Sequence, residues 1–300
     1  MNKLLVICGA TASGKTALAV ECVKKLNSEV ISADSQLVYK KLNIGTAKPS
    51  DEEKGGVIHH LIDVVDPDCS FSVSDYSALA EPIVNGLLKN GKTPIICGGT
   101  GFYINSLLYD LSYGNAAADS AVRAKYQSLL EERGKEYLYE LLKSIDPGSA
   151  SVLHENDTKR VIRALEIYEV SGKRKSDYND GLKLKREYLA VAVDFERDEL
   201  YARINARVDK MFECGLVDEV KGLLADGIDE KYQCMQAIGY KEVVECLKNG
   251  KNESTMRDVI KQNTRRYAKR QITFFKKLNG IVWLKPENAT ADNVLELYNG

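Results

Sequence analysis

The sequence lacks the features that mark membrane and exported proteins. No apolar run among its 300 residues approaches the ~20 residues that cross a bilayer, so we expect no membrane association. An apolar run already begins at residue 4, which leaves no room for a signal or transit peptide. Low-complexity tracts and internal repeats are also absent, and 44% hydrophobic residues can form a large core in one elaborated domain or two.

Paired cysteines and clustered histidines are missing as well. The seven cysteines are odd in number, scattered, and never spaced as C-x-x-C, which argues against a disulfide framework and a zinc site. His59, His60 and His154 have no partners at metal-ligand spacing, and we expect structural roles for them. These absences predict a reducing, cytoplasmic setting.

An excess of charge of either sign is also absent. The chain has 42 Lys and Arg against 43 Asp and Glu, a formal net charge of −1. The molecule as a whole therefore does not attract nucleic acid, and any such binding needs local basic patches. We expect a monomer.

A complete phosphate-binding loop is present near the N-terminus. The loop G-x-x-x-x-G-K-T consists of Gly9, Ala10, Thr11, Ala12, Ser13, Gly14, Lys15 and Thr16. It follows an apolar run and precedes a helical stretch, as such loops do when helix N–H groups bind an anion. We expect Lys15 to contact the outer phosphates and the Thr16 hydroxyl to bind Mg²⁺.

Short apolar runs alternate with helical stretches, which predicts an α/β fold. Strands are expected near residues 4–8, 29–33, 93–97, 188–193 and 281–284. Continuous apolar strands of this kind form a parallel sheet with helices on both faces. Ligands of such sheets bind at the carboxyl ends of the strands, where the phosphate loop lies.

The middle of the chain contains no convincing strand. Helical stretches near residues 122–133 and 159–170 are separated by turn signals, so we expect an all-helical insertion. The predicted domains are an α/β core of residues 1–111 and 187–300 and a helical insertion of residues 112–186.

Two polar features follow predicted strands on the core. Asp34 comes just after the second strand and is expected to be a metal ligand, a general base or the N-cap of a following helix. Asp63 ends another apolar run and is a weaker candidate for binding Mg²⁺. Gly98, Gly99, Thr100 and Gly101 follow the third strand, and this loop either lets a ligand approach closely or forms a tight turn.

Two basic clusters stand out against the neutral whole. Residues 257–277 contain eight Lys and Arg and one acid, with Lys261, Arg265 and Lys269 spaced for one helix face. The second cluster lies in the insertion, around residues 159–163 and 173–175. Tyr267, Phe274 and Phe275 are expected to add aromatic surface to the first cluster. Such clusters are solvated faces or contacts for nucleic-acid phosphates.

Taken together, several strings resemble the tRNA dimethylallyltransferase (tRNA isopentenyltransferase) family, bacterial type. Besides the phosphate loop, the strings lie at residues 32–35, 44–49, 59–63, 98–103, 160–166, 238–241 and 267–271. They cover nearly the whole chain in family order. The zinc-finger extension of eukaryotic members is absent. Gln36 and Leu37 replace a frequent Met-Gln, and Phe274 stands where tryptophan is usual.

The resemblance implies an activity and roles for individual residues. Members transfer a dimethylallyl group from dimethylallyl diphosphate to N6 of the adenosine 3′ to the anticodon, with Mg²⁺ as cofactor. By that match, Asp34 is the general base and Lys15 and Arg207 bind the diphosphate. By the same match, Thr100 is a further catalytic residue.

The same resemblance implies contacts with the tRNA anticodon stem-loop from both basic clusters. The implied contact residues are Asp34, Ser35, Gln36, Leu37, Thr100, Arg123, Lys159, Arg160, Val161, Ile162, Arg163, Gln236, Ala237, Ile238, Gly239, Tyr240, Lys241, Thr264, Arg265, Arg266, Lys269, Arg270 and Gln271.

Three other functions remain compatible with the phosphate loop. A small-molecule kinase would use the loop, Mg²⁺ and Asp34 for phosphoryl transfer. A prenyltransferase could act on free adenine nucleotides. A nucleotide-gated RNA-binding switch would need no catalytic aspartate, and Asp34 argues against it.

Overall fold

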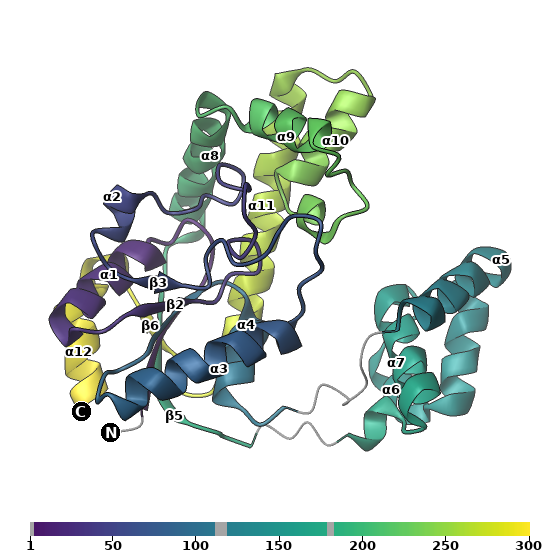
Figure 1. The fold of residues 1–300 in the computed structure, drawn as a ribbon, viewed down its shortest axis with the longest axis horizontal. Coiled ribbons are helices and arrows are strands. Elements are labelled where there is room, and N and C mark those ends of the chain that lie inside the picture. The colour runs from purple at the N-terminus through teal and green to yellow at the C-terminus, as the bar shows by residue number, and fades with distance from the viewer. Residues whose placement is uncertain (1–2, 112–118, 179–182) are drawn as a thin grey trace. The chain divides into compact units, whose positions relative to one another are not determined.

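The computed structural model describes residues 3–111, 119–178 and 183–300 (Figure 1). The chain divides into two compact units, one formed by Met1–Tyr109 with Leu184–Gly300 and the other by Asp110–Lys183. The predicted insertion spans residues 112–186, of which 112–118 and 179–182 lie outside the described residues.

A six-stranded parallel sheet forms the centre of the first unit, which confirms the predicted α/β class. The strands are β1 (Lys3–Cys8), β2 (Val30–Ser32), β3 (His59–His60), β4 (Ile95–Gly98), β5 (Glu187–Val193) and β6 (Val282–Leu284), in the order β3-β2-β4-β1-β5-β6. Leu4 to Cys8 are fully buried, as expected for a central strand covered on both faces.

Helices cover both faces of this sheet. On one face, α1 (Lys15–Leu26) and α12 (Ala291–Asn299) pack against the odd-numbered side chains of β1, such as Leu5 and Ile7. On the opposite face, α3 (Val73–Lys89) and α4 (Gly101–Leu108) pack against each other. There α11 (Glu253–Phe275) contacts α4 and runs beside α8 (Arg197–Glu213) (Figure 1).

Shorter helices complete the first unit. They are α2 (Asp51–Lys54), α9 (Leu216–Ala225), η2 (Gln233–Gln236), α10 (Tyr240–Lys248) and η3 (Pro286–Asn288). Within the described ranges, no helix combines the length and apolar character needed to cross a membrane.

The second unit is helical over its described residues. It contains α5 (Ser120–Ile145), α6 (Pro147–Val152), α7 (Thr158–Ser171) and η1 (Lys175–Asp177). Gly134, with φ 83°, interrupts α5, because a left-handed residue cannot continue an α-helix. The apolar faces of α5 and α7 pack together around Leu138, Leu142 and Leu165.

Two details differ from the predictions. The strand β3 was not predicted, because two histidines on a sheet edge show no hydrophobic periodicity. One of them, His60, has a structural contact: its Nε2 atom lies 2.6 Å from Glu29 Oε2. Phe275 was expected at the surface but is buried, since it lies on the inner face of the amphipathic α11.

Candidate active site

The phosphate loop connects β1 to α1 and leaves the helix N-terminus open. Gly9 (φ 123°) and Gly14 (φ 80°) adopt positive φ values that glycine tolerates, and Ala12 (φ 62°) adopts one as well. Ser13 Oγ donates to the Ala10 carbonyl at 2.9 Å, and Lys15 Nζ donates to the same carbonyl. Gly14 begins α1 without a side-chain cap, so the first N–H groups of the helix are available to an anion.

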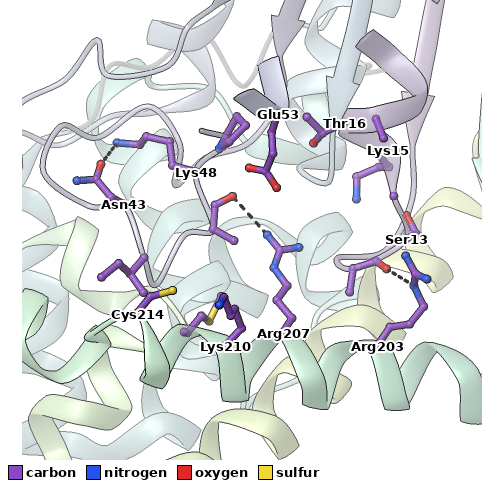
Figure 2. Close-up of a pocket in the computed structure, with 17 residues that line it drawn as sticks. Ser13, Lys15, Thr16, Asn43, Lys48, Glu53, Arg203, Arg207, Lys210 and Cys214 are labelled. Carbon is purple, nitrogen blue, oxygen red and sulfur yellow. Dashed lines mark hydrogen bonds between the residues drawn. The ribbon is translucent and has the colours of Figure 1, made fainter. Parts of the chain in front are cut away.

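Two arginines one helical turn apart on α8 hold loops on either side of this site. Arg203 Nε donates to the Ala12 carbonyl at 2.9 Å, and Arg207 Nη1 donates to Thr11 Oγ1 at 3.2 Å. Figure 2 shows both side chains rising from one face of the helix, with Lys15 and Thr16 opposite them. The second guanidinium arm of Arg207 reaches the Ala47 carbonyl.

The cations of the site are crowded and desolvated. Burial lowers the pKa of Lys15, and the nearby Arg207 lowers it further. Burial also lowers the pKa of Arg207, while Asp34 and Glu53 act in the opposite direction. Two partly buried, mutually repelling cations beside a helix N-terminus form a site suited to a multiply charged anion.

Two cavities meet at these cations. The larger, of about 770 Å³, extends from the phosphate loop to Asn43, Lys210 and Cys214. The smaller, of about 360 Å³, extends to Asp34 and α11. Both are lined by Lys15, Thr16, Ala47, Pro49, Arg207 and Met211. The site is therefore accessible from two sides, with the phosphate-binding groups in the middle.

Asp34 lines the second cavity and also shapes the turn that follows β2. Its Oδ1 atom accepts hydrogen bonds from the amides of Gln36 at 2.9 Å and Leu37 at 3.4 Å. The N-cap alternative is wrong, because turns rather than a helix follow Asp34 and these amides close a local Asx-type turn. The turn fixes the carboxylate at the cavity wall.

The Gly98–Gly101 loop packs closely against the protein's own atoms, although Gly98 also lines the second cavity. A Cβ at Gly98 would lie 2.1 Å from the Ala33 carbonyl oxygen, and one at Gly99 would lie 2.2 Å from Gln271 Nε2. The tight-turn alternative explains these glycines. The Thr100 hydroxyl accepts from the Ser35 amide at 3.0 Å, so Thr100 supports the turn that carries Asp34.

Many of the predicted RNA-contact residues converge on the second cavity. Its lining includes Asp34, Ser35, Gln36, Leu37, Gln236, Ala237, Ile238, Lys241, Thr264, Arg270 and Gln271. Arg123, Lys159, Arg160 and Arg163 belong to the second unit, where Arg123 and Arg163 pair with the buried Glu166.

Some predicted contacts need correction, because the side chains are inside the protein. Val161 and Ile162 lie in the core of the second unit, on the apolar face of α7. Tyr240 is buried, and its hydroxyl donates to Glu219 Oε1 at 2.6 Å. Gly239 is buried too, and its amide donates to Glu242. None of these four residues therefore offers an exposed side chain to RNA.

Gln271 is likewise buried, although it borders the cavity. Its Oε1 atom accepts from the Thr11 amide at 2.9 Å, and its Nε2 atom donates to the Gly99 carbonyl at 3.0 Å. It therefore joins the phosphate loop to the loop after β4.

The structure adds residues to the site predicted from the sequence and excludes one predicted residue from it. Arg203 was missed, although its spacing of four from Arg207 was a readable signal. Lys48, Pro49 and Glu53 also line the first cavity. Asp63 is not a metal ligand of this site, because its carboxylate pairs with Lys48 and lines neither cavity.

Comparison with known proteins fits this arrangement. Residues 37–278 match the family model described as IPP transferase, and residues 2–64 match one described as isopentenyl transferase. The chain belongs to the IPP transferase family. This membership confirms the resemblance seen in the sequence motifs.

Individual members are similar over nearly their full lengths. The tRNA dimethylallyltransferase of Alkaliphilus oremlandii is 44% identical over 289 residues, covering 96% of this chain and 92% of that protein. The crystal structure of the tRNA isopentenylpyrophosphate transferase of Bacillus halodurans matches with a TM-score of 0.72 and 41% identity, covering 100% and 95% of the two chains. A eukaryotic dimethylallyltransferase acting on tRNA matches with a TM-score of 0.80 and 30% identity, covering 96% and 74%.

Proposed function

We propose that this IPP transferase transfers a dimethylallyl group from dimethylallyl diphosphate to N6 of the adenosine 3′ to the anticodon of tRNA. The observation that carries the proposal is the meeting of two cavities at Lys15, Thr16 and Arg207, with Asp34 on one side only. This arrangement suits a diphosphate donor between the cations and an acceptor that arrives from the side of Asp34.

The donor half of the reaction requires stabilisation of a leaving group. As the bond between the allylic carbon and the diphosphate oxygen breaks, the electron pair leaves with the diphosphate. Lys15, Arg207 and the first amides of α1 surround the position where this negative charge increases. Arg203, which holds the phosphate loop at Ala12, keeps those amides in place.

The acceptor half requires a proton to leave the adenine amine. The new bond joins N6 to the allylic carbon, and the Asp34 carboxylate takes the N6 proton. The adenine must leave its stack to enter the cavity, as bases do in other enzymes that modify them. The narrow second cavity limits water at the allylic cation, which would otherwise be hydrolysed.

Magnesium would be held by the Thr16 hydroxyl together with donor oxygens and water. The described residues contain no group of three or more His, Cys, Asp or Glu side chains that could hold a metal by themselves. Thr16 lines both cavities, which suits Mg²⁺, an ion that uses few protein ligands alongside phosphate oxygens. The ion would supply further neutralisation of the departing diphosphate.

We also propose that the chain works as a monomer in the cytoplasm. All seven cysteines are free thiols, five of them buried, which suits a reducing compartment.

One experiment separates the candidate functions. The purified chain is incubated with Mg²⁺ and either labelled dimethylallyl diphosphate or labelled ATP, with tRNA, with adenine nucleotide, or with neither. We expect label from dimethylallyl diphosphate to appear in tRNA alone. Label in the free nucleotide, phosphate transfer from ATP, or no transfer to any acceptor would contradict the proposal.

A further inference from the structure

A groove on the surface of α11 lies next to the second cavity. It has a volume of about 390 Å³ and is lined by Lys269, Arg270, Thr273, Phe274 and Lys277. Arg270 lines both the groove and the second cavity, so the two adjoin at this side chain. If one unit of a polymer occupied the second cavity, the adjacent units of that polymer would lie beside the groove.

One half-buried aromatic ring, that of Phe274, lines this groove, and the exposed ring of Phe102 adjoins it. Phe102 is 64% exposed, and its ring centroid lies 5.5 Å from that of Phe274. Phe274 packs edge-on against the buried Phe275 and over Gly101, where a Cβ would lie 2.0 Å from the ring. A single exposed apolar side chain is ordinary, but here the exposed Phe102 ring adjoins Phe274, which is itself packed from below, and the two form an aromatic surface.

The charges along α11 differ between its two halves. In the first half, Arg257 and Lys261 both pair with Asp209, and Arg257 also pairs with Glu253. Beyond the exposed Arg266, the exposed cations are Lys269 and Arg270 on the helix and Lys276 and Lys277 directly after it. Across the described ranges, none of these four has an acidic side chain within ion-pair distance, as Arg257 and Lys261 have.

We propose that an unpaired base of the RNA substrate, one other than the adenine that enters the second cavity, stacks on Phe102 and meets Phe274 edge-on, because the two rings lie at 63° to each other. Lys269, Arg270 and Lys277 would bind the phosphates that flank this base. Every base has a π-face, and single-stranded nucleic acids are recognised by aromatic rings beside cations that follow the backbone. The proposal rests on the proposed function insofar as it takes RNA to be the acceptor.

The test uses an oligouridine that carries one 5-bromouridine, because such a strand contains no adenine amine. Binding to the full chain is measured by titration, and photo-crosslinks are mapped to peptides. Phe102→Leu and Phe274→Leu remove the aromatic faces at nearly constant volume, and Phe102→Tyr restores one. Leu79→Ala, another exposed apolar position, on α3, is the control for loss of surface.

We expect both leucine variants to bind oligouridine and tRNA roughly 5- to 150-fold more weakly, the range for loss of one stacked base. Phe102→Tyr and Leu79→Ala should bind like the wild type, and the crosslinks should lie at residues 102 or 274. Donor affinity should not change, because the phosphate loop lies outside the groove.

Equal RNA affinity of Phe102→Leu and the wild type, or crosslinks confined to other peptides, would overturn the proposal. Weaker binding by Phe102→Leu would not reflect misfolding, because Phe102 is highly exposed. An unchanged RNA affinity would point to a different occupant of the groove, such as a protein. Oligouridine binding without transfer to tRNA would instead contradict the proposed function while leaving the role of the aromatic surface intact.

Discussion

Arg207 donates a hydrogen bond from Nη2 to the carbonyl oxygen of Ala47, 3.4 Å away, and so joins α8 to the loop between β2 and α2. Ala47 has a positive φ of 50° and lines both cavities, as Arg207 does. The guanidinium that is placed to bind the donor therefore also holds the wall of the chamber where donor and acceptor meet.

The position of Arg207, and of Lys15 beside it, predicts how the loss of either cation affects catalysis. Lys15→Ala and Arg207→Ala should each lower kcat at saturating donor by roughly a hundred- to a thousand-fold, because both charges matter more as the diphosphate departs. Lys210→Ala is a matched control, since Lys210 lines the same cavity but pairs with Glu213 at the surface. Steady-state kinetics with varied donor measures the effect. A rise in KM at constant kcat would contradict preferential stabilisation of the transition state.

The position of Asp34 predicts a catalytic rather than a binding defect. Asp34→Asn should bind tRNA nearly normally but lose roughly two to four decades of prenyl transfer, the usual contribution of a general base. The asparagine oxygen can still accept from the Gln36 and Leu37 amides, so the turn should persist. Single-turnover rates and tRNA affinity are measured side by side. Turnover close to that of the wild type would mean that Asp34 only shapes the turn.

The contrast between the halves of α11 predicts which cations bind RNA phosphates. Neutralising Lys269 and Arg270 together should reduce the slope of log affinity against log salt by between about one and two units. The matched double variant of Arg257 and Lys261 should keep the slope, because Asp209 already neutralises these cations in part. Filter binding of tRNA over a range of salt concentrations checks both. Equal slopes for the wild type and the Lys269, Arg270 variant would identify a merely solvated surface.

Glu219 is predicted to hold the loop that lines the first cavity. Its carboxylate accepts from the amides of Asn43, Ile44 and Gly45 and from the Tyr240 hydroxyl. Glu219→Ala should lower the free energy of unfolding by about 2 kcal/mol, since hydrogen bonds to a charged group are lost. It should also raise the KM for the donor. Chemical denaturation measures the first effect, with Glu245→Ala, an exposed position on α10, as the control. Equal stability of the two variants would argue against this anchor.

Glu166 predicts a pH dependence for the stability of the second unit. Burial alone would raise the pKa of Glu166, but hydrogen bonds from Arg163, the Asp119 amide and Arg123 outweigh it and hold the pKa below its usual 4.5. A lowered folded-state pKa stabilises the fold above pH 4.5, and this stabilisation is lost as the pH falls through the folded value.

Glu166→Gln should therefore lower the melting temperature at pH 7 and reduce its fall between pH 5 and pH 3. Circular dichroism melting curves check this, with Glu140→Gln at the exposed pair with Lys143 as the control. The same dependence on pH in wild type and Glu166→Gln would exclude Glu166 as the source.

The sequence by itself determined five of the six strands of the sheet, the phosphate loop and the family. Continuous apolar runs such as residues 4–8 form buried parallel strands in any covered sheet, and two glycines, Lys15 and Thr16 at fixed spacing have a local conformation that needs no distant contact. Local signals also placed Asp34 at the end of a strand. These features depend on short-range sterics and hydrophobic period, which the sequence carries directly.

Only the tertiary structure decided which of the candidate side chains reach the site. The glycines after β4 accommodate Ala33, Gln271 and Phe274, and Asp63 pairs with Lys48, because segments far apart in sequence pack together there. Whether a cation on α11 is neutralised depends on Asp209 of another helix. Burial and charge pairing arise from contacts between distant residues, so a helical stripe of Lys and Arg predicts a basic face but cannot show which of its charges remain available to RNA.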